Sequence, residues 1–225
     1  MEFSVALKVK KKTLFPIGWK NTVTRTDDAA MTFVSLKEAM LFCWWFSKQQ
    51  GIPDDQQCYV FDGEFFDDSP EICTVENYLL KSGYRIPTEA EWEFACRAGA
   101  STSRYYGLTE NLLPNYAWYQ ANGNNRSWPV ASLKPNDFGL FDMQGNVFEW
   151  VYDTHSGSPT SLLAAAKDAP KTAAVSETVS RVLRGGSFGD LALLVRSAFG
   201  AAGGQPGFRD GFNGFRPART YNLSP

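Results

Sequence analysis

Histidine and cysteine are scarce in this sequence. Its 225 residues include one histidine, His155, and four cysteines, none of them beyond Cys96. A lone histidine in a loop is far more often a surface residue than a catalytic base. Neither a Ser/His/Asp arrangement nor a phosphate-binding glycine loop is found. The cysteines follow no metal or thioredoxin spacing; Cys43 and Cys96 are expected to be buried thiols, whereas Cys58 and Cys73 are either free or paired.

Long hydrophobic runs and strong net charge are also missing. The longest apolar run, Ala39–Phe46, has eight residues. That is too few to cross a bilayer, so no membrane span is expected. Met1–Val9 has no apolar core of a signal peptide, which favours a cytoplasmic protein in a reducing compartment. The net charge is -2 and the basic residues cluster only at Lys8–Lys12, which argues against nucleic acid as a partner.

Apolar and aromatic residues, by contrast, are plentiful. Hydrophobic residues make up 44% of the chain and aromatic residues 15%, enough for the core of one globular domain. Ser35 and Thr88 each have a glutamate three residues further on, which makes a capping box at the start of an apolar helical pattern. The first predicted helix ends near Gly51 and the second at Gly99.

The remaining segments predict strands and ordered loops. They are an N-terminal extension over 1–30 that packs on or leads into the domain, a short hairpin over Cys58–Phe66, ordered loops over 100–140, a surface insertion over 156–180, and strands within Arg181–Phe188 and Asn213–Thr220. The domain itself is expected over 31–225. Two helices, short antiparallel strands and long ordered loops define an α+β fold rather than a doubly wound sheet.

Four segments together carry a resemblance to a known family. They are Tyr84–Gly99, Asn136–Trp150, Arg181–Phe188 and Gly214–Ala218. In this order they resemble the formylglycine-generating enzyme and sulfatase-modifying-factor family, over roughly residues 30–220. The resemblance implies a C-type-lectin-like fold with little regular secondary structure.

Carboxylates crowd a glycine-containing turn in the second of these segments. Asp142 and Glu149 flank Asn146 there, and buried carboxylates in such a turn must be paired or metal-bound. Oxygen ligands at close spacing suit calcium. The resemblance implies a structural calcium held by the side chains of Asp142 and Glu149 and the carbonyls of Gly145 and Val147. The alternative is that Asn146 and Glu149 only hydrogen-bond to loop backbone and to arginines.

The residues that would make the chain an enzyme of this family are missing. The resemblance implies a cysteine pair that engages copper shortly after Gly185–Ser187, and soft thiolates cannot be replaced there. No cysteine follows that motif. The related sulfoxide-synthase branch implies three histidines for iron in an added domain, and this chain has one histidine. We therefore predict a protein that is not an enzyme and that requires no cofactor.

The interval 189–213 mixes two kinds of position. The first kind belongs to a framework, namely Val195, Arg196, Ser197, Ala198, Gln205, Pro206, Gly207 and Arg209. Of these, Val195, Arg196 and Ala198 are expected to be buried or hydrogen-bonded, as are Phe188, Phe215 and Arg216 on either side of the interval. The second kind carries large apolar residues among glycines and small residues, without a helical or strand period. These predicted ligand-binding positions are Gly189, Asp190, Leu191, Leu193, Leu194, Phe199, Ala201, Ala202, Gly203, Phe208, Asp210, Gly211 and Phe212. We expect their side chains to lie mostly at the surface, gathered on one face.

This pattern resembles one branch of the same fold, the variable proteins of diversity-generating retroelements. In that branch adenine-directed mutagenesis rewrites the last part of the domain. Asparagine codons randomised at their first two bases never give Lys, Glu, Gln, Met or Trp. Across 189–213 Lys, Glu, Met and Trp are absent, and the one glutamine, Gln205, lies at a framework position.

The sequence therefore favours a non-catalytic binding protein with a diversified surface. Its partner is an unknown ligand, expected to be a protein whose pockets accept leucine and phenylalanine side chains. Two alternatives stay open. One is a formylglycine-generating-type oxidase, against which the missing cysteines count. The other is an undiversified structural or regulatory lectin-like domain in which 189–213 is a divergent loop.

Overall fold

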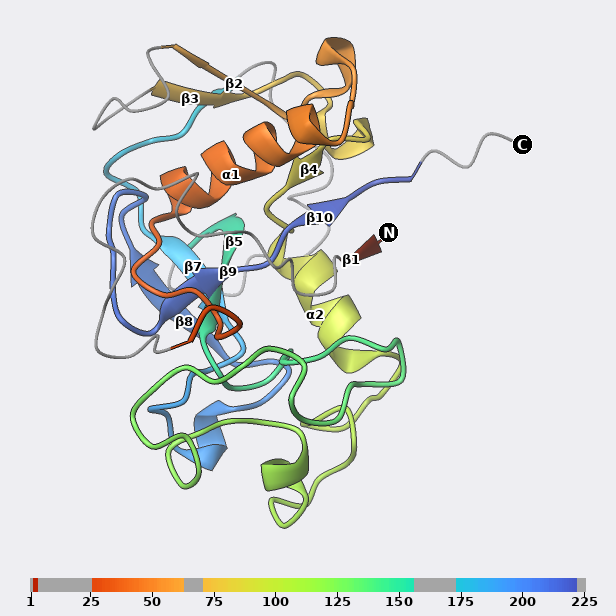
Figure 1. Ribbon diagram of the computed structural model, residues 1–225, viewed down its shortest axis with the longest axis vertical. Coiled ribbons are helices and arrows are strands. Elements are labelled where there is room, and N and C mark those ends of the chain that lie inside the picture. The colour runs from red at the N-terminus through yellow and green to blue at the C-terminus, as the bar shows by residue number, and fades with distance from the viewer. Residues whose placement is uncertain (1, 4–25, 63–70, 156–172, 222–225) are drawn as a thin grey trace.

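The computed structural model describes residues 2–3, 26–62, 71–155 and 173–221 (Figure 1). The helices and strands in them are β1 (Glu2–Phe3), α1 (Leu36–Gln49), β2 (Tyr59–Asp62), β3 (Glu71–Thr74), β4 (Tyr84–Arg85), α2 (Glu89–Arg97), β5 (Phe148–Thr154), β6 (Ala173–Ala174), β7 (Arg181–Arg184), β8 (Gly200–Gly204), β9 (Asn213–Phe215) and β10 (Ala218–Arg219). Short 3-10 helices lie between them: η1 (Asp54–Gln56), η2 (Tyr78–Leu80), η3 (Leu113–Asn115) and η4 (Ala192–Leu194). These elements confirm the predicted α+β class. Within the described ranges no helix has the length and apolar character that a membrane crossing requires.

Helix α1 begins at the predicted capping box. The Ser35 hydroxyl accepts a hydrogen bond from the Glu38 N–H at 3.2 Å, and the Glu38 carboxylate accepts one from the Ser35 N–H at 2.9 Å. The apolar face of the helix, which includes Met40 and Cys43, is completely buried. The helix lies between the sheet of β2 and β3 and the strands β4 and β9 (Figure 1).

Helix α2 begins at the second predicted capping box and ends just before Gly99. Ala98 has a left-handed φ of 47° and Gly99 a φ of 90°, and glycine reaches this region at no steric cost. Trp92, Ala95 and Cys96 form its buried face, which packs against β5 and β7. The predicted start and end of this helix are confirmed.

The described strands form three small sheets. Their strand orders are β1-β10-β4, β2-β3-β6 and β8-β7-β5-β9. The pairs are antiparallel as predicted, with the exception of β9, which runs parallel to β5. In the four-stranded sheet β7 is buried along its whole length, and Trp150 of β5 is completely buried. The indole N–H of Trp150 donates to the Val34 carbonyl at 2.8 Å, which joins this sheet to the segment that leads into α1.

The hairpin predicted over Cys58–Phe66 assigned the wrong partner strand to β2. Strand β2 pairs with β3, so that Tyr59 lies opposite Thr74. The connection between the two strands, residues 63–70, lies outside the described residues.

The predicted insertion over 156–180 is described only at its C-terminal end. Residues 156–172 lie outside the described residues. The end of the segment is not a surface loop, because β6 pairs with β3 and Val175 is buried. Most of the predicted N-terminal extension also lies outside the described residues; in its first residues, β1 pairs with β10.

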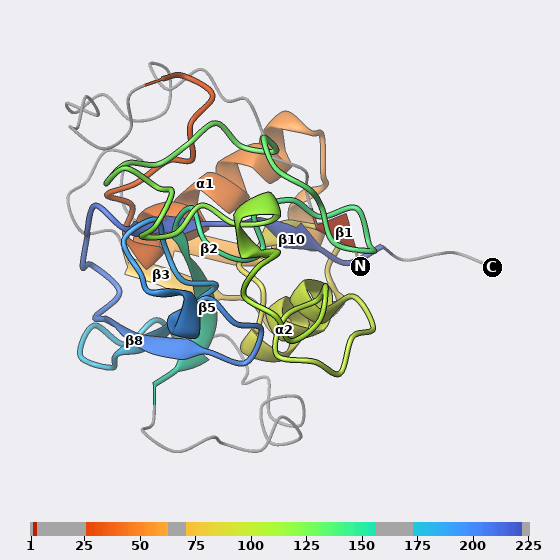
Figure 2. The ribbon, with the colours of Figure 1, turned by 90° about the horizontal axis from the view of Figure 1, so that it is seen from below.

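The chain between α2 and β5 forms loops at one end of the molecule (Figures 1 and 2). Stacked aromatic rings pack within them. Tyr106 and Tyr116 stack with centroids 4.4 Å apart, and Trp118 and Trp128 stack at 4.1 Å. These loops support the segment that follows β7.

Candidate ligand-binding site

A tight turn after β7 starts the variable segment, which we define as residues 189–213. Gly185 and Gly186 have φ values of 95° and 77°, which favour glycine. A Cβ at Gly185 would also lie 3.2 Å from the Trp92 ring. Ser187 then donates from its N–H and its hydroxyl to Asp190 Oδ2, at 2.8 and 2.6 Å. These contacts fix the direction in which the chain leaves the sheet.

Hydrogen bonds to its backbone carbonyls attach the variable segment to the rest of the domain. The bonds run from Gln120 N–H to the Asp190 carbonyl (2.9 Å), from Arg104 Nη2 to the Ala192 carbonyl (2.7 Å), from Lys37 N–H to the Pro206 carbonyl (3.3 Å) and from Phe33 N–H to the Asp210 carbonyl (2.9 Å). Because every acceptor is a carbonyl of the main chain, side chains in the segment can change without loss of these bonds.

Most of the predicted ligand-binding positions are accessible. Leu191, Leu193, Ala202, Phe208 and Phe212 are exposed, and Gly189, Asp190, Leu194, Phe199, Ala201 and Asp210 are half-buried. Leu191, Leu193, Phe208 and Phe212 keep 51%, 53%, 47% and 40% of their surface exposed. Large apolar side chains usually lie inside, and a cluster of them at the surface is typical of an interaction site.

Eight of the predicted positions line a single pocket of about 220 Å³, here called the variable-segment pocket. The lining consists of Gly189, Asp190, Ala201, Ala202, Gly203, Phe208, Asp210 and Phe212, together with Phe148, Leu183, Ser187 and Asn213. The other predicted positions, Leu191, Leu193, Leu194, Phe199 and Gly211, do not line it. Eight of the thirteen predicted ligand-binding positions therefore share one face, and the other five lie outside it.

Sequence reasoning missed four residues of this pocket. Phe148 and Leu183 lie on β5 and β7, Ser187 lies in the turn after β7, and Asn213 begins β9. Which side chain of a short strand faces a pocket depends on the strand order and register of the sheet. The sequence contains no local signal for either.

Two predicted surface positions are buried, which corrects the prediction for them. Gly203 and Gly211 have little solvent exposure. A Cβ at Gly203 would lie 2.6 Å from both Leu183 Cγ and Trp150 Cζ3. Gly203 is therefore held as glycine by the sheet beneath it, and it belongs to the framework.

Two predicted framework positions are exposed. Arg196 and Ala198 point to solvent, whereas their neighbours Val195 and Ser197 are buried. The chain turns here, with the Phe199 N–H donating to the Arg196 carbonyl at 3.1 Å, and this turn leaves Arg196 and Ala198 on the outside. Phe188, Val195 and Arg216 are buried as predicted, and the half-buried ring of Phe215 packs against Phe42 at 5.2 Å.

Glu149 lies at the centre of a buried network. Its Oε1 accepts from Arg216 Nε and Nη2 at 3.1 and 2.7 Å, and its Oε2 accepts from Arg216 Nε at 3.0 Å and from Trp92 Nε1 at 2.7 Å. The Arg216 Nε–H is shared between the two oxygens, so three N–H groups occupy most of the roughly four acceptor directions of the carboxylate. Glu149 therefore does not fit a calcium ligand in this arrangement.

Asn146 also binds the loop backbone. Its side-chain oxygen accepts from the Trp128 N–H at 3.0 Å, and its Nδ2 donates to the Trp128 carbonyl at 3.2 Å. The predicted ligand carbonyls of Gly145 and Val147 flank this residue. Among the described residues, no three His, Cys, Asp or Glu side chains lie close enough together to hold a metal ion. The geometry supports hydrogen bonding as the role of this turn.

Of the two predicted carboxylate ligands, Asp142 is the one with an oxygen that accepts no hydrogen bond. Its Oδ2 accepts from the Ala131 N–H at 2.7 Å, while its buried Oδ1 has no hydrogen-bond partner. Burial raises the pKa of this carboxyl above its ordinary value, against the lowering effects of the Ala131 N–H and the nearby Arg216. The residue also has a left-handed φ of 57°, which asparagine tolerates as well as aspartate.

Asp142→Asn is expected to stabilise the protein at neutral pH by on the order of 1 kcal/mol, because an unsatisfied buried oxygen costs more when it is charged. A folded-state pKa above the unfolded one means that the unfolded chain loses its proton first as pH rises. The difference in melting temperature between variant and parent should therefore be small below about pH 4 and grow above it.

A calcium site at Asp142 would give the opposite order of stability for the parent and the Asp142→Asn variant. If Asp142 held a calcium ion, the parent would melt at a lower temperature with a chelator and the Asp142→Asn variant would be the less stable protein. We expect a chelator to leave both melting curves unchanged. A chelator-dependent shift in the parent alone, with calcium found by elemental analysis, would establish the metal site instead.

Comparison with known proteins identifies the family. Residues 10–221 match the model of the sulfatase-modifying factor enzyme 1-like domain. The chain belongs to this family. This finding confirms the resemblance inferred from the four sequence segments.

Proteins similar in sequence to this chain include two that are named as enzymes. The chain is 37% identical to a formylglycine-generating enzyme of Mycobacterium tuberculosis over 125 residues, which cover 49% of this chain and 42% of that protein. It is 35% identical to the serine/threonine-protein kinase pkn1 of Chlamydia pneumoniae over 140 residues, which cover 62% of this chain and 22% of that protein. The match thus spans less than half the length of these relatives.

A solved structure of similar fold is Treponema denticola variable protein 1. The two share 28% sequence identity with a TM-score of 0.67, over 90% of this chain and 75% of that chain. This likeness, with the family match, confirms the C-type-lectin-like fold of the sulfatase-modifying-factor type. It also supports the relationship to variable proteins inferred from the sequence.

None of the four cysteines of this family member lies in the turn after β7 or in the segment that follows it. All four are free; Cys43, Cys58 and Cys96 are buried and Cys73 is half-buried. Burial raises the thiol pKa of Cys58 and of Cys96 to about 12 and that of Cys43 well above its usual value. Thiols with such pKa values are almost entirely protonated at neutral pH, which makes them poor nucleophiles and poor metal ligands.

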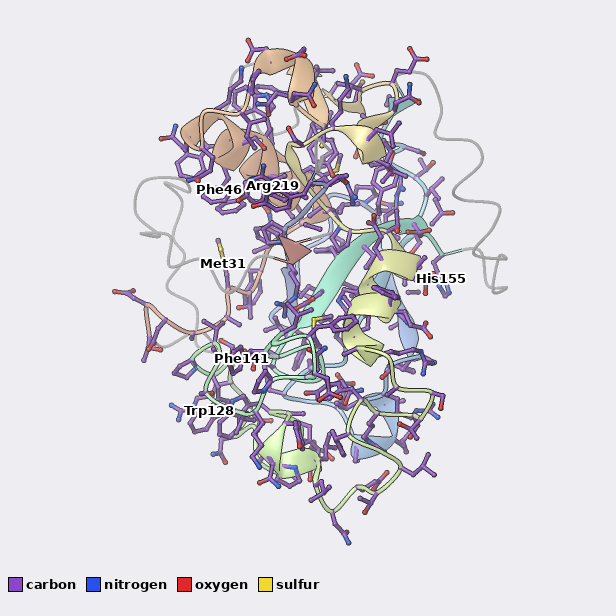
Figure 3. All side chains as sticks on the ribbon, turned by 90° about the vertical axis from the view of Figure 1, so that its right-hand side faces the viewer. Met31, Phe46, Trp128, Phe141, His155 and Arg219 are labelled. Atoms are coloured by element: carbon purple, nitrogen blue, oxygen red, sulfur yellow. The ribbon has the colours of Figure 1, made fainter. Side chains whose placement is uncertain are left out.

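The lone histidine is not among the residues that line the variable-segment pocket. His155 is exposed just beyond the end of β5, and Figure 3 shows it on the opposite side of the view from Trp128 and Phe141. The prediction of a surface residue is confirmed.

Proposed function

We propose that this chain is a non-catalytic ligand-binding protein whose variable segment is diversified by a retroelement. Different copies would then present different side chains on one framework. One observation supports this proposal most strongly. The variable segment is attached to the domain through its main-chain carbonyls, while it exposes large apolar side chains. The likeness to Treponema denticola variable protein 1 is in accord with it.

The surface that this copy presents favours a protein as the ligand. Leucine and phenylalanine side chains at 40% exposure or more project from the segment, and they would fill apolar pockets on a partner. A rigid scaffold that holds variable side chains works in the same way as an antibody framework. The undiversified lectin-like domain is the alternative, and no specific contact favours it.

The oxidase alternative can be tested directly. We expect no formylglycine above the metal-only background when the protein is incubated with copper and a sulfatase-type cysteine peptide, with mass spectrometry as the readout. The physical reason is that Cys96 and Cys58 carry thiols of pKa about 12 and that no cysteine follows Ser187. Turnover above background that is lost in a Cys96→Ser variant would restore the oxidase interpretation.

A randomised library tests the scaffold role without knowledge of the ligand. Four exposed positions, Leu191, Leu193, Ala202 and Phe208, are randomised together, and folded clones are counted by protease resistance on a display system. Substitutions at exposed sites usually change stability by less than about 0.5 kcal/mol, so we expect most clones to fold. Folded clones that bind a chosen protein, such as lysozyme, should then be selectable.

A matched control library randomises four buried framework positions, Trp150, Val182, Phe188 and Val195. Each loss of a large buried side chain costs about 2–5 kcal/mol, comparable with total stability, so few of these clones should fold. If both libraries lose folding to the same extent, the variable segment does not serve as a tolerant display surface and the proposal fails.

A further inference from the structure

The charge in the variable-segment pocket is of one sign. Asp190 and Asp210 both line it, and its lining contains no lysine, arginine or histidine. The aromatic residues of the lining are Phe148, Phe208 and Phe212. Aromatic faces carry negative electrostatic potential and attract cations, so the carboxylates and the rings favour the same kind of guest.

Neither Asp190 nor Asp210 forms an ion pair with a lysine, arginine or histidine in the described part of the chain. Arg209, the neighbour of Asp210 in the chain, forms an ion pair with Glu38 of α1, with Nε 2.8 Å from Oε2. Asp190 uses one oxygen, Oδ2, for the Ser187 N–H and hydroxyl. In the described part of the chain its Oδ1 receives no hydrogen bond, and Asp210 has no ion-pair partner.

The size of the pocket limits what can enter. A volume of about 220 Å³ is below the range of about 300–1,000 Å³ that is usual for drug-sized ligands. One long side chain of a protein partner is a better match than a whole small molecule. An apolar stem would contact the phenylalanines while a charged head reaches the carboxylates.

We propose that this pocket accepts a lysine or arginine side chain of a protein partner. The inference rests on the proposed function, since it names the chemistry of the group that the variable surface binds. Leu191 and Leu193, which do not line the pocket, would contact the partner around this side chain. The predicted ligand is therefore a protein surface with a basic residue next to apolar ones.

Amino-acid probes test this inference without the natural ligand. The amide spectrum of the ¹⁵N-labelled protein is recorded during titration with Nα-acetyl-lysine methylamide, with the arginine analogue and with the norleucine analogue. Norleucine has an apolar stem without the charge and is the matched control. We expect saturable shifts at Gly189 and Ala201–Gly203 with lysine, arginine or both, and much smaller shifts with norleucine. Higher salt should weaken the binding.

Substitutions of the two aspartates test whether their charges bind the cationic probes. Asp190→Asn and Asp210→Asn keep the shape and an acceptor oxygen, and each should weaken probe binding at least about threefold, with roughly tenfold loss in the double variant. Asp137→Asn, at an exposed position outside the pocket, should have no effect. Shifts that are equal for norleucine, that are absent, or that are unchanged in the double variant would overturn the inference.

Failure here is distinguishable from failure of the proposed function. If the probes leave the pocket unaffected while the exposed-position library still yields binders, the cation site is wrong and the diversified surface stands. If the cationic probes bind but the library does not fold, the pocket is a fixed cation site on an undiversified domain.

Discussion

Glu149→Ala is expected to destabilise the protein by about 3–5 kcal/mol. The substitution leaves the buried guanidinium of Arg216 without its counter-ion and the indole N–H of the fully buried Trp92 without its acceptor. An unpaired buried charge costs far more than the intact pair contributes, because water cannot reach it. Thermal and denaturant unfolding, followed by circular dichroism, measure the loss.

Two further variants show whether pairing is the cause. Asp54→Ala, which removes an exposed ion pair with Lys48, should change stability by less than about 0.5 kcal/mol. Glu149→Leu combined with Arg216→Met removes both charges, and it should be clearly more stable than Glu149→Ala. A loss below about 1 kcal/mol in Glu149→Ala would show that the network is not essential to the fold.

Gly203→Val is expected to destabilise the protein by about 1–3 kcal/mol or to prevent folding. The new Cβ would lie 2.6 Å from atoms of Leu183 and of Trp150, closer than carbon atoms can pack. Trp150 is completely buried and its indole is hydrogen-bonded to the Val34 carbonyl, so the ring cannot move aside without loss of that bond.

The adjacent position provides the matched control. Ala202 lies on the same strand and is exposed, so Ala202→Val should change stability by less than about 0.5 kcal/mol. Equal tolerance at both positions would contradict the assignment of Gly203 to the framework and would return it to the diversified set.

The helices of this fold were predictable because their signals are local. Each capping box places a hydroxyl and a carboxylate three residues apart in sequence, and that spacing determines both contacts. The parallel pairing of β9 with β5 and the correct partner of β2 depend on residues far apart in the chain. No local pattern specifies such pairs, so the sequence alone could not reveal them.

The candidate site was predictable only where a residue's own type and its sequence neighbours reveal its role. Leu193 and Phe208 stand out as large apolar residues among glycines, and their exposure agrees with the interpretation. Gly203 looked equally variable, since glycine in a sequence does not show whether a ring lies above its Cα. Glu149 was assigned to a calcium site or a hydrogen-bond network, and only the position of Arg216 distinguishes the two.

The most direct test of the central claim is the DNA sequence around the gene in several isolates. The account predicts a reverse transcriptase gene and a near-copy of the 3′ end of this coding sequence. In this near-copy, adenines stand at the positions that correspond to the codons of exposed residues such as Leu193 and Phe208. Differences between isolates should fall at those codons and spare Phe188, Val195 and Gly203. A locus without the repeat and the reverse transcriptase, with differences spread evenly over buried and exposed codons, would contradict it.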